Sequence, residues 1–355
     1  MTTPSNVALL RPPSDPSPRY LHEHPIEHAT IKEVAPGVHW VRMPLPIPSL
    51  DHINLWVLDD GDDFVMVDTG YSSNHTHDNW EAIFSGPLSG RRANRLICTH
   101  FHNDHASTTG WIMARMGCDF HMTQGEYLSA SSAFGGHGLD RREHTIELLR
   151  SNGLDPRIAG EALDFRSQFG KDIKDFPVSY NRMFGDTELK INGRTWEIIL
   201  GYGHSPEHAA LYCAELGVLI AGDMILPRIT TNVSVQAMEP NGNPLQWFLD
   251  SIARHALLPA DTLILPSHGL PFHGLRDRVA YLRRHHKQHL NKLVTACETP
   301  KSAADVLPIL FHRKLSERDT RIAMGESMAH MNMLYYEGRI KRQIDNERVI
   351  RYVQA

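Results

Sequence analysis

A dense group of metal-binding side chains lies between residues 99 and 105, where the sequence reads Thr-His-Phe-His-Asn-Asp-His. His100, His102, Asp104 and His105 are four potential ligands within six residues. They follow the apolar run 95–98, which predicts a buried strand that ends at the histidines. In an extended chain His100 and His102 point to the same side, whereas Asp104 and His105 fall where a helix could begin and face a neighbouring point. The spacing therefore indicates two adjacent metal positions.

Four further apolar runs also lead to a histidine or an aspartate. A histidine-rich surface loop is the alternative interpretation, because the chain holds 23 histidines. The repeated pattern of strand followed by ligand favours a metal site, since the carboxyl ends of strands in an α/β fold gather at one rim, where active sites form. The runs are 196–200 before His204, 217–222 before Asp223, 262–267 before His268, and 64–67 before Asp68.

These motifs resemble those of the metallo-β-lactamase-fold hydrolase superfamily. The similarity lies in Val67-Asp68-Thr69-Gly70, the H-x-H-x-D-H cluster, Gly203-His204-Ser205-Pro206, Ala221-Gly222-Asp223 and Ser267-His268-Gly269. The motifs follow the order of the superfamily. The resemblance implies an α/β fold, a four-layer αββα sandwich, here with a helical insertion and a C-terminal winged-helix-like domain.

The resemblance also implies ligands for two divalent ions. One ion would be held by His100, His102 and His204, the other by Asp104, His105 and His268, with Asp223 bridging the two. Five imidazoles and two carboxylates suit zinc, with iron and manganese as alternatives. Asp104 would also hold the attacking hydroxide in line, and Asp68 would orient the histidine cluster, unless Asp68 only caps a loop.

The function expected from this resemblance is hydrolysis of a small-molecule ester, thioester or lactone by a metal-bridging hydroxide. Asp223 is similar to the bridging carboxylate of glyoxalase II-like hydrolases, whereas antibiotic-degrading β-lactamases usually lack a carboxylate there. His102 stands where oxygen-reducing diiron relatives have glutamate. Two alternatives stay open, a metal-dependent endoribonuclease or phosphodiesterase and a mononuclear-iron persulfide dioxygenase-like enzyme. A DNA-binding regulator with a relic metal site is disfavoured because the ligand set is intact.

Alternating and apolar runs predict the elements that must position the ligands. Residues 30–272 should form the catalytic domain, after an extended, disordered or surface-hugging lead-in over residues 1–29. Helical segments at 124–132, 141–151 and 155–169 lie in an insertion of about 124–186, interpreted as a lid over the substrate pocket or as a purely structural insertion. The other expected strands are 31–34, 38–42, 53–58, 64–67, 119–122, 188–191 and 195–200, and the other helices are 74–84 and 106–116.

The sequence predicts a separate helical domain over residues 273–355. A long helix at 275–296, two more at 303–310 and 318–337, and a basic hairpin at 339–353 resemble the winged helix of one subgroup that includes endoribonucleases of single-stranded RNA. This segment has 16 Lys and Arg against 9 Asp and Glu, whereas the rest of the chain has 20 against 32. A basic segment could steer RNA or an anionic small substrate, or it could be a solvated helical surface.

Four residues near the expected metal rim are candidates for substrate binding. They are Tyr202, Arg228, Phe272 and His273. Arg228 lies five residues after Asp223, close enough in sequence to reach an anionic group of a substrate, although a surface ion pair is an equal alternative.

Composition is typical of a globular protein, with 41% apolar residues, 22% charged residues and a net charge of −5. No apolar run approaches the length of a membrane-spanning helix. The four cysteines lack C-x-x-C spacing and are expected to be free thiols in a reducing cytoplasm. The expected partner is a small molecule that could be anionic, with RNA as the less favoured one, and the sequence does not indicate an oligomeric state.

Overall fold

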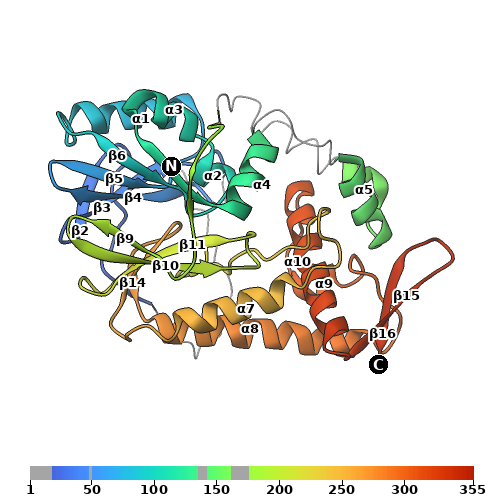
Figure 1. Cartoon of the computed structure of the whole chain (residues 1–355). Helices are drawn as coiled ribbons and strands as arrows, with labels where there is room; N and C mark the ends of the chain where they lie inside the picture. The colour runs from blue at the N-terminus through green and yellow to red at the C-terminus, as the bar shows by residue number, and fades with distance from the viewer. Residues whose placement is uncertain (1–17, 48–49, 135–141, 161–175) are drawn as a thin grey trace, which may run out of the picture.

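A computed structural model describes residues 18–47, 50–134, 142–160 and 176–355 (Figure 1). Its first sheet has seven strands. The first four form an antiparallel meander, and the last three are added in parallel. In spatial order the strands are β2 (Ile31–Ala35), β3 (Val38–Pro44), β4 (His52–Asp60), β5 (Asp63–Val67), β6 (Ala93–Ile97), β7 (Asp119–Thr123) and β8 (Asn181–Met183).

The second sheet also has seven strands. Its neighbours are antiparallel except for the parallel pair β12 and β13. Every residue of β12 is buried, which explains its continuous apolar sequence, because a central strand covered on both faces does not alternate. In spatial order the strands are β1 (Arg19–Tyr20), β14 (Phe272–His273), β13 (Leu263–Pro266), β12 (Val218–Gly222), β11 (His208–Cys213), β10 (Arg194–Gly201) and β9 (Glu188–Ile191).

Helices cover the outer face of each sheet, so the molecule has the expected αββα layers (Figure 1). The helices α1 (Asn74–Ser85) and α3 (Thr109–Met116) cover the first sheet, and α7 (Pro244–His255) and α8 (Leu275–Ala296) cover the second. Three apolar cores follow from this stacking: one under α1, one between the sheets, and one under α7 and α8. The predicted fold class is confirmed.

The insertion after β7 contains helices α4 (Gln124–Phe134) and α5 (Arg142–Ser151), close to their predicted bounds. The expected glycine-rich turn at 135–138 lies outside the described residues, as does most of the helix expected at 155–169. The expected helix 106–116 is two helices, α2 (Asn103–Ala106) and α3, which are interrupted at Ser107 and Thr108.

The described part of the N-terminal lead-in contains a short strand at the edge of the second sheet. Residues 1–17 lie outside the description, but β1 pairs with β14 and extends the second sheet. Leu21 continues the pairing by donating its backbone N–H to the carbonyl of Pro271 at 2.9 Å. Two residues are too short a run to predict a strand from sequence, and the partner strand β14 is equally short.

The C-terminal segment continues from α8 into α9 (Leu307–Leu310), α10 (Glu317–Tyr336) and the hairpin of β15 (Ile340–Ile344) and β16 (Ile350–Gln354). Its apolar side chains belong to the same core as those of the second sheet, so α8 and α10 are packed onto the catalytic layers. The helices and hairpin occur in the expected order, and the assignment as a winged helix stays a prediction.

All four cysteines are buried and free. Among the described residues, the helices are each too short or too polar to cross a membrane.

Candidate metal centre

Two short elements after β6 orient the first four ligands. The chain stays extended through His102, which begins α2 with φ −60° and ψ 151°, so His100 and His102 project to one side. Asp104 and His105 lie on the single turn of α2 and face the adjacent space. The change from extended chain to helix within three residues therefore separates the four side chains into two groups.

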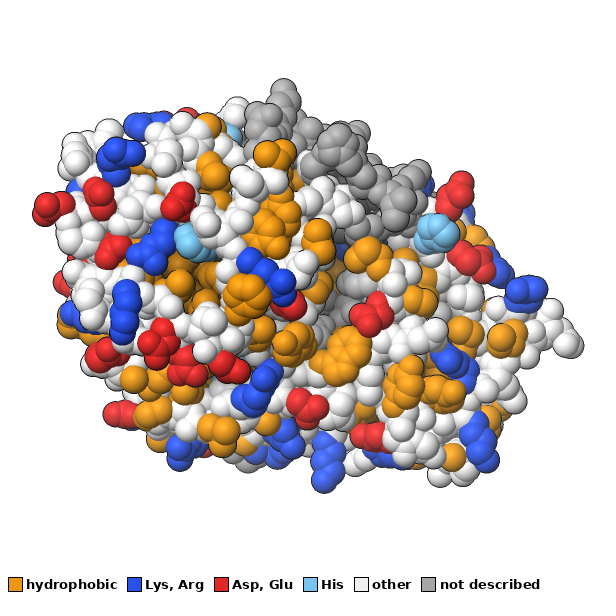
Figure 2. All heavy atoms as spheres, viewed as in Figure 1, with side chains coloured by type: hydrophobic (Ala, Val, Ile, Leu, Met, Phe, Trp, Pro, Cys, Tyr) orange, Lys and Arg blue, Asp and Glu red, His pale blue; other side chains and the backbone are white. Residues whose placement is uncertain are grey.

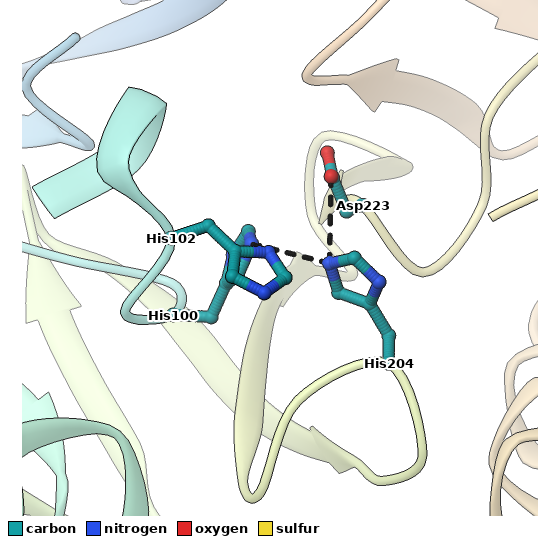
Figure 3. Close-up of side chains that lie close together, drawn as sticks. All are labelled: His100, His102, His204 and Asp223. Atoms are coloured by element: carbon teal, nitrogen blue, oxygen red, sulfur yellow. Dashed lines mark hydrogen bonds and ion pairs between the residues drawn. The ribbon is translucent and has the colours of Figure 1, made fainter. Parts of the chain in front are cut away.

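The first group consists of His100, His102, His204 and Asp223 (Figure 3). His100 Nε2 lies 2.9 Å from His102 Nδ1 and 3.2 Å from His204 Nε2. An Asp223 carboxylate oxygen, Oδ2, lies 3.4 Å from His204 Nε2. The side chains come from the loops after β6, β10 and β12, and Figure 3 shows the rings and the carboxylate pointing toward one another.

The second group consists of Asp104, His105 and His268. His268 Nε2 lies 3.3 Å from Asp104 Oδ2. The other oxygen of Asp223, Oδ1, lies 3.5 Å from both His105 Nε2 and His268 Nε2. Asp223 thus presents one oxygen to each group, which is the arrangement of a carboxylate between two cations.

The donors fit metal ions because two of their buried atoms make no hydrogen bond in the described structure. His105 Nε2 and Asp223 Oδ1 are buried and make no hydrogen bond within the described structure. Buried polar atoms without partners are costly, and ligation would satisfy both. Imidazole nitrogens and carboxylate oxygens suit zinc, iron or manganese, so the donor set fits two divalent ions without identifying the metal.

Backbone and carboxylate acceptors hold the ligand rings from behind. Asp68 lies 2.8 Å from His105 Nδ1 and accepts the Thr99 backbone N–H at 2.7 Å. His204 Nδ1 and His268 Nδ1 donate to backbone carbonyls at 2.7 and 2.9 Å, leaving each Nε2 directed at the centre. The carbonyls belong to Asn232 and His52, which sequence reasoning missed because a backbone acceptor has no residue signature.

The electrostatics differ between the two groups. Burial lowers the pKa of His102 to about 3, and it lowers the pKa of His100 well below its usual value, so both rings are neutral and ready to bind metal. Burial would also lower the pKa of His268, but the Asp223 and Asp104 carboxylates outweigh it and raise that pKa to about 10. A metal ion must therefore displace a proton from His268, and its binding should strengthen as pH rises.

Glu126 on α4 is a positioning residue that sequence reasoning missed. Its side chain is fully buried and accepts hydrogen bonds from the Phe101 N–H at 3.0 Å, the Glu207 N–H at 2.7 Å and the Ser205 hydroxyl at 2.6 Å. Burial raises its pKa to about 7 despite these bonds. Glu126 joins the loop carrying His100 and His102 to the loop carrying His204. A lone glutamate in a predicted helix gave no signal of this role.

Two adjoining cavities open onto the metal donors. The first, about 350 Å³, is lined by His102, Asp104, His204, Asp223 and His268 together with apolar side chains. The apolar lining includes Leu50, Tyr71 and Phe101, together with Ile322 and Met328 of α10. The second, about 530 Å³, shares His102 and His204 and extends toward Tyr202, Trp247 and Arg254.

The four expected substrate residues are placed differently from one another. Tyr202 lines the second cavity. Arg228 is exposed, and its guanidinium lies over the Tyr20 ring, 5.9 Å from the ring centre. Phe272 is fully buried in β14. His273 Nδ1 donates a hydrogen bond to the Asp261 backbone carbonyl. Arg228, Phe272 and His273 are not among the described residues that line either of these two cavities, and the substrate role of all four residues stays a prediction.

Comparison with known proteins agrees with this geometry. A family model described as Metallo-beta-lactamase superfamily matches residues 49–268, and one described as Metallo-beta-lactamase-like, C-terminal domain matches residues 290–355. The first match covers more than half of the chain, and the second falls on the C-terminal helices and hairpin.

Three individual relatives match over most of their lengths. A crystal structure of a beta-lactamase domain protein from Burkholderia ambifaria is 41% identical, covers 95% of this chain and 98% of that one, and has a TM-score of 0.86. A metallo-beta-lactamase family protein from Thermus thermophilus is 26% identical, with coverage of 91% and 100% and a TM-score of 0.77. A protein of Bacillus subtilis (strain 168), named a probable metallo-hydrolase, is 22% identical over 84% of this chain and 92% of its own.

Proposed function

We propose a reaction for this chain, which belongs to the metallo-beta-lactamase superfamily of metallo-hydrolases: the hydrolysis of a small-molecule ester, thioester or lactone. The observation that carries the proposal is the meeting of two donor groups at Asp223, beside a cavity of about 350 Å³. A cavity of that size is typical of small-molecule sites. The predicted family is confirmed, and the substrate class is our inference.

The residues have separate tasks in such a reaction. When bound, two divalent ions supply a hydroxide near neutral pH and polarise the carbonyl oxygen of the substrate. Asp223 holds the two ligand groups together, and Asp68 fixes the orientation of His105. Asp104 also lines the cavity and has an 18% exposed side chain, so its carboxylate is placed to accept a hydrogen bond from the attacking water.

The lining of the first cavity supports a substrate with an apolar part and an anionic part. Leu50, Phe101 and Met328 offer apolar contact, and Arg321 on α10 adds a cation to the same lining. Arg321 is therefore our candidate for contact with an anionic part of the substrate, alongside the expected Arg228, which is not among the described lining residues of this cavity. A guanidinium beside a hydrolytic centre would favour an acyl substrate that carries a carboxylate or phosphate.

The RNA alternative has weaker support. Arg339 of the hairpin is paired with Glu337 at 3.0 Å, and Arg342 lies over the Tyr335 ring and donates to Asn241. The hairpin lies beyond α10, away from the strands that carry the metal donors (Figure 1). On the face drawn in Figure 2, basic and acidic side chains are interspersed and do not form a continuous basic surface.

A hydrolysis screen of the metal-loaded protein tests the proposal. The full chain is reconstituted with Zn²⁺, Mn²⁺ or Fe²⁺ and assayed on esters, thioesters, lactones, β-lactams, phosphodiesters and single-stranded RNA, with oxygen uptake measured on a persulfide. We expect turnover of an acyl substrate that a chelator abolishes and added metal restores. Cleavage of RNA or a phosphodiester alone, or oxygen uptake alone, would replace the proposed substrate class.

A further inference from the structure

A second cluster of metal-binding side chains lies between α8 and α10, separate from the catalytic donors. It contains His285, His286 and His289 of α8 and Glu326 and His330 of α10. Residues four apart on a helix share a face, so His285 and His289 form one pair and Glu326 and His330 another, and the two pairs come from packed helices. Paired histidine and glutamate on facing helices is a recurrent way to build a metal site.

Three of these residues converge closely enough to share one ion. One ligand atom from each of His289, Glu326 and His330 lies within 4.8 Å of the others. His330 Nδ1 donates to the Glu326 backbone carbonyl at 2.8 Å, which leaves the lone pair on His330 Nε2. The same relation of Nδ1 to a backbone carbonyl orients His204 and His268 in the catalytic centre.

The hydrogen bonding of the cluster is incomplete without a further group. His289 Nδ1 is buried and has no partner in the described structure. Glu326 is 8% exposed, and none of the hydrogen bonds or ion pairs of the described residues involves its carboxylate. Burial alone raises the pKa of Glu326 to about 7. A buried ring nitrogen without a partner is costly, and an ion bound between His289 and the Glu326 carboxylate would give both a partner.

We propose that His289, Glu326 and His330 bind a third divalent transition-metal ion, which joins α8 to α10. Two imidazoles and one carboxylate are a donor set that zinc accepts, with a water as fourth ligand. The side chains of His289 and Glu326 are partly exposed, so an ion can enter from solvent. His286 Nδ1 lies 3.1 Å from His330 Nε2, and ion binding would replace this hydrogen bond.

An ion at this position would also stabilise one side of the first cavity. Gly325 and Met328 line the first cavity, and they alternate along α10 with Glu326 and His330. An ion that fixes the α8 side of α10 therefore fixes the helix that forms one cavity wall. The site itself is independent of the proposed substrate, since none of its donors belongs to the catalytic centre.

Metal content of matched variants tests the proposal. Dialysed full-length protein is loaded with Zn²⁺, and the metal bound per chain is measured. We expect three equivalents in the wild type, two in Glu326→Gln, and one in a His100→Ala, His268→Ala double variant. His75→Gln, which removes an exposed histidine of α1, should retain three. Equal zinc content in the wild type and Glu326→Gln would overturn the proposal, even if the catalytic centre binds fewer ions than expected.

A spectroscopic readout separates ligation from misfolding. In the catalytic double variant, added Co²⁺ should produce one visible absorption band, which disappears in the Glu326→Gln and His289→Gln versions and persists in the His75→Gln version. Saturating Zn²⁺ should raise the melting temperature of the double variant by roughly 5 °C, and it should not do so after Glu326→Gln. A band and a shift that survive both ligand changes would show that the ion binds elsewhere.

Discussion

At the scale of single residues, Asp223 is the side chain that both donor groups share. Replacement by asparagine keeps the shape but removes the charge that would hold two cations together. We expect Asp223→Asn to lower kcat/KM at least ~100-fold on any substrate of the wild type, by comparison with the removal of other electrostatic groups at a reacting centre. The decrease should be accompanied by a lower metal content. Asp119→Asn, an exposed change on β7, is the control, and near-normal turnover in Asp223→Asn would mean that one ion suffices.

Asp68 offers a sharper test of positioning. It has φ +63°, a left-handed conformation that asparagine tolerates better than most residues, so Asp68→Asn preserves the backbone while removing the charge beside His105. We expect metal affinity to fall 10- to 100-fold, roughly, as for other changes behind a ligating histidine. Asp186→Asn is a matched control, because Asp186 also has positive φ (58°) but is exposed. Unchanged affinity in Asp68→Asn would leave Asp68 only a loop-capping role.

The sequence predicted the donors better than their supports. His100, His102, Asp104 and His105 are consecutive enough for local geometry to show that they separate into two groups. Glu126 acts through three bonds to distant loops, and no local pattern distinguishes it from any helical glutamate. The substrate role of Arg228 stays a prediction, and its guanidinium lies over the Tyr20 ring, which proximity in sequence to Asp223 did not indicate.

At the scale of elements, α7 is a helix that was not predicted, although its sequence contains a signal for it. Leu245, Phe248 and Ile252 are buried at helical spacing, and Pro244 occupies the first turn after Asn243, so the helix could have been predicted from this stretch. The bounds of α8 were predicted correctly, since a long amphipathic pattern carries more information. The strands β1 and β14 have only two residues each, too few to show an alternating apolar pattern, and they are recognised by their pairing with each other.

His255 makes α7 sensitive to acid. It is fully buried, and burial lowers its pKa to about 4, so the unfolded chain takes up a proton as pH falls below 6.5 whereas the folded chain does not. Its contribution to stability is therefore present above pH 6.5 and is lost as pH falls toward 4. We expect the difference in unfolding free energy between pH 7.5 and pH 5 to be about 2 kcal/mol smaller in His255→Leu than in the wild type.

Urea denaturation at the two pH values measures this difference. Leucine should be accepted because His255 Nδ1 bonds only to the Ser251 carbonyl of its own helix, and Nε2 has no partner in the described structure. His75→Gln on α1 is the exposed control and should keep the wild-type difference. An unaltered pH dependence in His255→Leu would mean that other buried histidines govern acid unfolding.

At the scale of the whole molecule, the C-terminal segment is part of the catalytic architecture. Its helices share a core with the second sheet, and Ile322 and Met328 of α10 line the first cavity. The sequence indicated helices followed by a hairpin, but it could not show which face of α10 meets the metal centre, because that depends on how two distant segments pack. The positive charge of the segment suggested RNA binding, whereas in the structure α10 of this segment lines the small cavity beside the metal donors.

The hairpin distinguishes these two roles. We expect the triple change Arg339→Gln, Lys341→Gln and Arg342→Gln to leave hydrolysis of the best small substrate within a few-fold, because the hairpin lies away from the two sheets whose strands lead to the metal donors (Figure 1). An RNA-cleaving enzyme would instead bind RNA more weakly, and the slope of log affinity against log salt would fall by about 0.7 for each phosphate that the hairpin no longer neutralises. Lys287→Gln with Lys292→Gln on α8 is the charge control. A steep decrease of RNA cleavage in the triple variant alone, without acyl hydrolysis in the parent, would reverse the proposed ranking.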